Sequence, residues 1–426
     1  MTSSAQQRQY LVSITIIGVL FFIFGFVTWI NGTLIPYLKI ACELKTDLQS
    51  YLVVTAFFIA YTIMAIPSSL VLKKTGYKKG MSIGLFIMAI GAALFIPAAS
   101  IRNYNLFLVG LFIIGSGLAL LQTASNPYAT ILGPIESAAT RISIMGICNK
   151  VAGIIATWIF GYIALNDADE IVASLKTMDA ATQAATLDEL ASRVIIPYAI
   201  IAFVLVVLAI AVLFSALPDI KDDQAEEFSS SQSSPKTSIF QFPYLILGVV
   251  TLFLYVGVEV IAGDTIISYG KSLGIELSIA RYFTQATLVC MLVGYIIGIT
   301  MIPKYLTQST ALKICAILGI VFTGLAVLTP GYISVACIAL LGLANSLMWP
   351  AIWPLAIGGL GKFTKLGSAL LIMAIAGGAI VPLLYAKLSE SLGGQLAYGM
   401  MIPCYLFILY YAVSGHLAGR AKSQLL

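Results

Sequence analysis

The amino-acid sequence predicts an all-α membrane protein, with twelve transmembrane helices arranged in two pseudo-symmetric six-helix bundles. Two observations carry this prediction: 60% of the 426 residues are hydrophobic and only 10% are charged, and the mean hydropathy is +1.00. A water-soluble domain needs a charged exterior and cannot hide so much apolar surface. A chain surrounded by lipid can, and its length suits twelve helices of about 20 residues joined by short loops.

Twelve apolar runs support this count. At a rise of about 1.5 Å per residue, roughly 20 residues cross the ~30 Å of hydrocarbon in a bilayer. Each run must be helical, because lipid offers no partners for unpaired backbone N–H and C=O groups. The runs cover residues 10–38, 48–72, 80–100, 104–132, 141–165, 194–216, 243–270, 278–302, 309–329, 331–357, 364–387 and 395–416.

Lysine and arginine residues predict the orientation of the chain. If the N-terminus lies in the cytoplasm, the inner loops carry 14 of these residues and the outer loops carry 8. Positive residues favour the cytoplasmic side of a membrane. We therefore expect a multi-pass protein of the bacterial inner membrane with both termini in the cytoplasm.

Two polar stretches interrupt the apolar runs. Residues 217–240 are serine-rich and acidic, a composition typical of a flexible linker. This cytoplasmic linker divides a predicted N-terminal bundle, residues 1–216, from a C-terminal bundle, residues 241–426. In 167–193, Ala and Leu recur at helical spacing, which predicts an outer loop with a short amphipathic helix lying on the membrane.

The two halves carry traces of a duplication. Asn31 to Lys39 aligns with Gly263 to Lys271, so that Thr, Ile, Tyr and Lys recur at a constant offset of 232. The basic stretch LKKTGYKKG at 72–80, in which Gly76 is expected to make a tight turn, has a weaker echo after the eighth run. Parallel repeats of this kind are typical of transporters that bind their substrate between the halves, near the middle of the membrane.

Three stretches resemble the fucose–galactose–hexose symporter family of the major facilitator superfamily. They are LFLVGLFIIGSGLALLQTASNPYATILGP at 106–134, IPSSLVLKKTGYKKG at 66–80 and KLGSALLIMAIAGGAIVP at 365–382. The resemblance covers nearly the whole chain and implies sugar uptake by alternating access, driven by a cation gradient. The L-fucose permeases of this family have acids where this chain has Gly32 and Gln122. These two departures bring the chain closer to the glucose/galactose members.

Amide side chains inside the apolar runs are candidates for sugar binding, because an amide both donates and accepts hydrogen bonds, as a sugar hydroxyl does. Gln122 and Asn126 are four residues apart and share a helix face. The resemblance implies that these two and Asn149 line the cavity. The candidates are Asn31, Gln122, Asn126, Asn149, Gln285 and Asn345. Amides also join neighbouring helices by hydrogen bonds, and this alternative stays open above all for Gln285 and Asn345.

Aromatic rings are expected to stack on the apolar face of a sugar. Trp349 and Trp353 are four residues apart in the tenth run, so one helix face presents two indoles. The alternative is a belt of tryptophans at the membrane surface. Trp349 lies deeper in its run and is the stronger candidate for stacking. Trp29, close to Asn31, is a weaker one.

Ionisable residues inside the membrane are costly and often mark an ion or substrate path. Glu259, Asp264 and Lys150 are the ones that fall well within the predicted helices. Opening of the helix at Gly263 would let Asp264, Thr265 and freed carbonyls offer several oxygens to Na⁺, whereas a proton needs a single carboxylate. A structural pair between Lys150 and one of the acids is the alternative.

These expectations add up to cation-coupled uptake of a hexose such as glucose or galactose, with Na⁺ favoured over H⁺. A hexose uniporter and an H⁺-coupled symporter are the alternatives. The chain has no GxxxxGK[ST] or HExxH motif, so we expect no enzyme activity. We expect no cofactor apart from Na⁺ as a possible coupling ion, no metal site and no nucleic-acid partner. The expected partners are a sugar, the cation and the lipid bilayer, with the chain working as a monomer.

Overall fold

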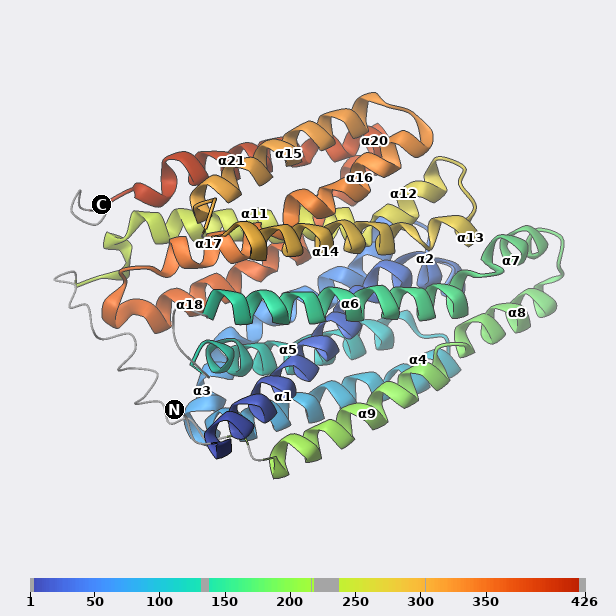
Figure 1. Cartoon of the computed structure of the whole chain (residues 1–426). Helices are drawn as coiled ribbons and strands as arrows, with labels where there is room; N and C mark the ends of the chain where they lie inside the picture. Colours follow the sequence, from blue (N-terminus) through green and yellow to red (C-terminus); the bar gives the residue numbers. More distant parts are fainter. Residues whose placement is uncertain (1–3, 132–137, 216, 218–236, 303, 421–426) are drawn as a thin grey trace.

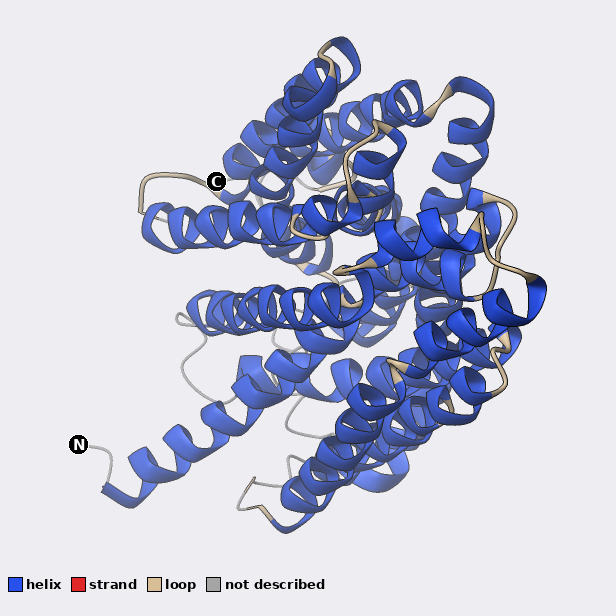
Figure 2. Cartoon of the chain, turned by 90° about the vertical axis from the view of Figure 1, so that its right-hand side faces the viewer, coloured by secondary structure: helices blue, strands red, loops and turns tan. Residues whose placement is uncertain are grey.

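Helices make up almost all of the computed structural model, which describes residues 4–131, 138–215, 217, 237–302 and 304–420 (Figure 1). Within these ranges no residue belongs to a strand (Figure 2). Most of the predicted linker, residues 217–240, lies outside the described residues.

The N-terminal half forms one bundle of helices, blue to green in Figure 1. Its helices are α1 (Ser4–Trp29), α2 (Asn31–Ala41), α3 (Asp47–Ala93), α4 (Phe95–Ser100), α5 (Tyr104–Ile131), α6 (Ala138–Leu165), α7 (Ala168–Leu175), α8 (Ala180–Ser192) and α9 (Ile195–Phe214).

The C-terminal half forms the second bundle, with short 3-10 turns between some of its helices. Its helices are α11 (Pro243–Asp264), α12 (Ile266–Ser272), α13 (Leu277–Ala280), α14 (Phe283–Met301), α15 (Gln308–Leu328), α16 (Gly331–Ser346), α17 (Met348–Ile357), α18 (Thr364–Met373), α19 (Gly377–Leu392), α20 (Gly394–Ala397) and α21 (Met401–Val413).

The expected number of membrane spans is confirmed. The described residues contain 11 helical stretches that are long and apolar enough to cross a membrane. One of them, 47–100, has 54 residues and is interrupted at Gly76, where φ is 76° and ψ is 170°. Glycine adopts this left-handed backbone without steric strain. The stretch therefore counts as two spans, and Gly76 makes the turn expected from LKKTGYKKG.

Close helix contacts recur at equivalent places in the two bundles. A Cβ atom at Gly25 of α1 would lie 1.9 Å from the carbonyl oxygen of Asn149 in α6. A Cβ atom at Gly377 of α19 would lie 1.8 Å from the carbonyl oxygen of Phe253 in α11. Each pair joins the first and the fifth span of its half. Glycine lets these backbones touch, which agrees with the duplication seen in the sequence.

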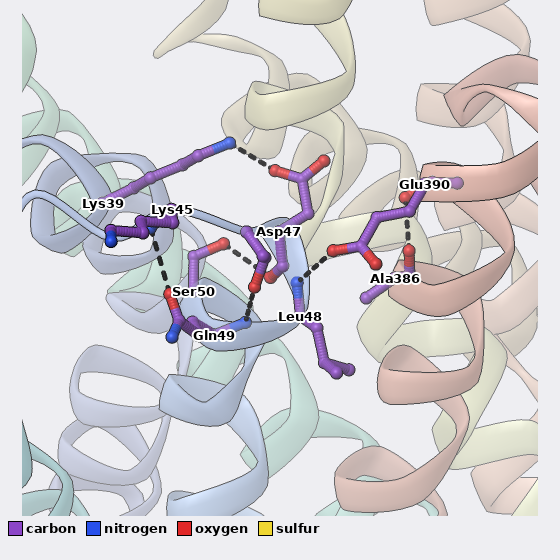
Figure 3. Close-up of polar contacts among 10 residues, drawn as sticks. Lys39, Lys45, Asp47, Leu48, Gln49, Ser50, Ala386 and Glu390 are labelled. Atoms are coloured by element: carbon purple, nitrogen blue, oxygen red, sulfur yellow. Dashed lines mark hydrogen bonds and ion pairs between the residues drawn. The ribbon is translucent and has the colours of Figure 1, made fainter.

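The bundles are joined by polar contacts at one face of the molecule, here called the far face, opposite the end of the bundles where α1 begins and α21 ends (Figure 1). The Glu390 carboxylate of α19 accepts a hydrogen bond of 3.2 Å from the Leu48 backbone N–H at the start of α3 (Figure 3). Asp169 of α7 pairs with Lys271 at the end of α12.

The polar stretch 167–193 differs from the expected single helix on the membrane. It forms the helical pair α7 and α8. Helix α8 packs on α2 and α4 of the N-terminal bundle, and α7 contacts α6 and also α13 of the C-terminal bundle. Arg193 donates to both carboxylate oxygens of Asp167 at 2.5 and 2.7 Å. The Tyr37 hydroxyl donates to the Leu190 carbonyl at 2.8 Å. Polar groups of this segment therefore have fixed hydrogen-bond partners within the protein, and these bonds hold α7 and α8 in place.

Candidate functional site

A cavity of about 160 Å³ lies between the two bundles. Both bundles supply its walls, and its lining combines aromatic rings, amides and three ionisable groups. The lining residues are Phe21, Phe24, Thr28, Trp29, Phe58, Tyr61, Gln122, Asn126, Ile142, Gly146, Asn149, Lys150, Tyr255, Val256, Glu259, Val260, Asp264, Tyr295, Trp349, Pro350 and Ile375.

Three of the six candidate amides line this cavity. Gln122 and Asn126 come from α5 and Asn149 comes from α6. The Asn149 side-chain oxygen accepts a hydrogen bond of 3.2 Å from the Trp29 indole N–H. The amide nitrogen of Asn149 remains as a donor, so this wall offers both kinds of hydrogen-bonding group.

The other three candidate amides lie outside the lining. Asn345 accepts a hydrogen bond of 2.9 Å from the Tyr405 hydroxyl, which joins α16 to α21. The Asn31 side chain is fully buried, and neither of its polar atoms has a partner among the described residues. The Gln285 amide nitrogen is likewise buried without one. Of these three amides, Asn345 is the one that forms an interhelical hydrogen bond within the described residues.

One of the two paired tryptophans faces the cavity. Trp349 belongs to the lining, and Trp353 stacks on it from outside the lining, with ring centroids 5.5 Å apart and planes 21° apart. Trp29, the weaker candidate in the sequence, lies in the wall. The cavity's Phe and Tyr rings were not predicted, because in a chain so rich in aromatic residues nothing local distinguishes a cavity ring from a packing ring.

An ion pair crosses the interface between the bundles. Lys150 of α6 donates to Glu259 of α11 at 3.2 Å, and their side chains are 7% and 13% exposed. The Lys150 ammonium also lies 4.3 Å from the centre of the Trp29 ring. A pair between Lys150 and one of the two acids was the alternative left open by the sequence, and the structure pairs Lys150 with Glu259.

Asp264 is the second acid of the cavity. It is 1% exposed, and its Oδ1 atom has no hydrogen-bond partner among the described residues. A Cβ atom placed on Gly32 would lie 3.2 Å from this oxygen. The carboxyl group of Asp264 therefore occupies the space next to Gly32 that a side chain at position 32 would enter.

Several of the oxygens expected to bind Na⁺ near Asp264 have hydrogen-bond partners in the described residues. The chain is interrupted between α11 and α12, as expected near Gly263, but the carbonyls of Gly263 and Ala262 accept hydrogen bonds from Thr284 and Thr287 at 2.7 and 3.4 Å. The Thr265 hydroxyl lies outside the lining. It donates to the Ile261 carbonyl at 2.7 Å and lies 2.7 Å from the Tyr398 hydroxyl. Each of these oxygens therefore already takes part in a hydrogen bond between helices or within one.

Comparisons with known proteins agree with this architecture. Residues 17–381 match the Major Facilitator Superfamily. A glucose/galactose transporter of Brucella abortus is 36% identical over 417 residues, which cover 97% of this chain and 96% of the relative. The L-fucose-proton symporter of Escherichia coli is 30% identical over 96% of this chain and 94% of its own length.

A solved structure extends the match to three dimensions. The crystal structure of the transporter FucP in the outward conformation has a TM-score of 0.73 and 28% identity, over 95% of this chain and 98% of FucP. None of these proteins is named as a sodium symporter, so the comparisons also give no support to the preference for Na⁺. The chain belongs to the major facilitator superfamily of membrane transporters, and within it to the fucose–galactose–hexose symporter family.

Proposed function

We propose that this protein takes up a hexose of the glucose and galactose class into a bacterial cell, with the proton as the coupling ion. The observation that carries the proposal is that one cavity between the bundles is lined both by amides and an indole that suit a sugar and by buried acids. The 36% identity to a glucose/galactose transporter supports the substrate class.

The cavity suits a sugar because it combines two kinds of wall. Gln122, Asn126 and Asn149 offer donors and acceptors to hydroxyl groups. Trp349 offers an indole face to the C–H side of the ring, as aromatic residues do for apolar surfaces. Amides on α5 and α6 lie in one bundle and Trp349 in the other, so a sugar between them would touch both.

Proton coupling follows from the two acids in the same lining. Burying an unpaired carboxylate costs several kcal/mol, and a bound proton removes that charge. Among the described residues, one oxygen of Asp264 has no hydrogen-bond partner, whereas Glu259 has the Lys150 ammonium beside it. We assign the transported proton to Asp264 and its control to the Lys150–Glu259 pair. The relative named as an L-fucose-proton symporter supports this choice of ion.

The orientation completes the proposal. With both termini in the cytoplasm of an inner-membrane protein, the far face is the outer side, and Glu390 and Asp169 close it. The structure then represents a state closed to the outside. One chain contains both bundles and the whole cavity lining, so a monomer in the bilayer suffices for transport.

A hexose uniporter is the second candidate. The observation that favours it is the Lys150–Glu259 pair, which balances its charges without an added ion. In that case Asp264 would stay protonated throughout and would not move a proton.

Counterflow of labelled glucose or galactose in proteoliposomes tests the transport proposal without any ion gradient. We expect transient accumulation of label when the vesicles are preloaded with unlabelled hexose, and none when they are preloaded with an unrelated polar solute. Absence of hexose counterflow in a folded, reconstituted protein would overturn the proposed substrate.

A further inference from the structure

Trp29 lies in a slot built by both bundles. The ring is 4% exposed. A Cβ atom at Gly153 of α6 would come within 2.5 Å of its Cδ1 atom, and one at Gly263 of α11 within 2.5 Å of its Cζ3 atom. Leu288 and Met291 of the C-terminal bundle pack with the ring. The slot therefore depends on two glycines, and it fixes a residue of the N-terminal bundle against the C-terminal one.

The Trp29 ring contacts both the Asn149 amide and the ion pair of the cavity. Its indole N–H donates to the Asn149 side-chain oxygen at 3.2 Å. Its face lies 4.3 Å from the Lys150 ammonium, which in turn donates to Glu259 at 3.2 Å. A cation is attracted to the face of an indole, most strongly away from water.

We propose that Trp29 is a positioning residue that couples sugar binding to the Lys150–Glu259 ion pair. This inference rests on the proposed function. The indole N–H orients the Asn149 amide so that its nitrogen donates to a sugar hydroxyl, and the ring face holds Lys150 beside Glu259. A sugar that draws Asn149 towards itself moves the ring, and the movement weakens the hold on Lys150.

Two substitutions separate the two contacts. Trp29→Phe keeps a ring face for Lys150 and loses the N–H, so we expect the half-saturating hexose concentration in counterflow to rise about fivefold while proton-driven accumulation relative to counterflow is unchanged. Trp29→Leu loses both contacts. We expect the same or a larger rise, together with loss of accumulation while counterflow continues.

A third substitution reaches the ring from the other bundle. Gly263→Ala displaces the ring and should also lower accumulation relative to counterflow, whereas Gly324→Ala, where a Cβ atom meets open space, should not. Parallel loss of both activities in Trp29→Leu, or an unchanged ratio, would overturn the inference. Failure of the parent protein in counterflow would instead overturn the proposed function.

A second inference comes from the far face, where each bundle offers a carboxylate to a helix start of the other. Asp169 of the N-terminal bundle accepts hydrogen bonds from the backbone N–H groups of Leu277 and Ser278 at 2.5 and 3.3 Å. Glu390 of the C-terminal bundle accepts one from the Leu48 N–H at 3.2 Å. Asp169 follows the fifth span and Glu390 lies in the last turn of the eleventh. The helix starts open the second and eighth spans, so the arrangement is reciprocal.

We infer that Asp169 and Glu390 are two latches that open together when the far face opens. Free N–H groups at a helix start attract anions, and each latch satisfies such groups only while the bundles touch. Rigid-body rocking of the bundles separates both pairs at once.

Hydrogen–deuterium exchange of the full chain measures the latched amides directly. We expect Asp169→Ala to speed exchange at least about tenfold at residues 277–278 and also at the distant residue 48, with Glu390→Ala giving the converse. Asp179→Ala is the matched control, because Asp179 caps its own helix at Ala181 and Thr182. Faster exchange confined to the helix start next to the substituted acid would overturn the inference.

Discussion

Gln122 and Asn149 are the residues on which hexose affinity should depend most directly. Gln122→Ala and Asn149→Ala should each weaken binding by about 1–3 kcal/mol, because each leaves a buried sugar hydroxyl without a partner. Equilibrium binding of glucose and galactose to the purified variants measures this. Asn345→Ala is the control, since Asn345 bonds Tyr405 outside the cavity and should affect stability instead. Unchanged affinity in both cavity variants would place the sugar elsewhere.

Trp349 should act through its ring. Trp349→Ala should lose affinity, while Trp349→Phe should retain part of it, because a smaller ring still stacks on a sugar. Binding titrations compare the two, and Trp158→Ala, at a 59% exposed position, should bind as the parent does. Equal losses in both Trp349 variants would favour a hydrogen bond through the indole N–H over stacking.

A carboxyl group supplied from position 32 should replace the one from position 264 in part, since the Asp264 carboxyl lies beside Gly32. Asp264→Ala alone should abolish proton-driven hexose accumulation. Adding Gly32→Asp returns a carboxyl group to the same space from the other bundle and should restore part of it. Uptake into vesicles under an inward proton gradient gives the answer, and a double variant as inactive as the single one would contradict the spatial equivalence.

At the scale of elements, the junction between α11 and α12 depends on threonines of α14. Thr284→Val should destabilise the folded protein by about 1–2 kcal/mol, because the buried Gly263 carbonyl loses its hydrogen bond. Thr300→Val is the matched control, since exposed Thr300 bonds carbonyls of its own helix. Thermal unfolding in detergent should show a lower midpoint for Thr284→Val alone. Equal midpoints for the two variants would show that Thr284 does not stabilise the junction between α11 and α12.

The helices themselves were largely predictable from the sequence. Apolar runs of membrane-spanning length fix the spans, and Gly76 marks the turn that separates the second from the third. The pair α7 and α8 was less predictable, because its position depends on ion pairs such as Asp167 with Arg193, formed by residues 26 positions apart. Spacing shows that a helix is amphipathic but not which surface it covers.

At the scale of the whole molecule, the site is predictable only in part. Depth in a helix pointed to Lys150, Glu259 and Asp264, because a charge in the membrane stands out in any apolar run. The sequence does not reveal which amides face the cavity. Asn31 is as deep as Asn149, yet it lies outside the lining, since the rotation of each helix depends on packing between bundles. Trp29 was undervalued for the same reason.

The most direct test of the account is hexose uptake into vesicles under separate proton and sodium gradients. We expect the parent protein to accumulate glucose or galactose when the outside is made more acidic, and to gain nothing from inward Na⁺ at constant pH. Asp264→Asn and Glu259→Gln should lose this accumulation and keep hexose exchange, which needs no net movement of protons. Accumulation that follows Na⁺ at constant pH, or that follows neither gradient, would contradict proton coupling through the acids of α11.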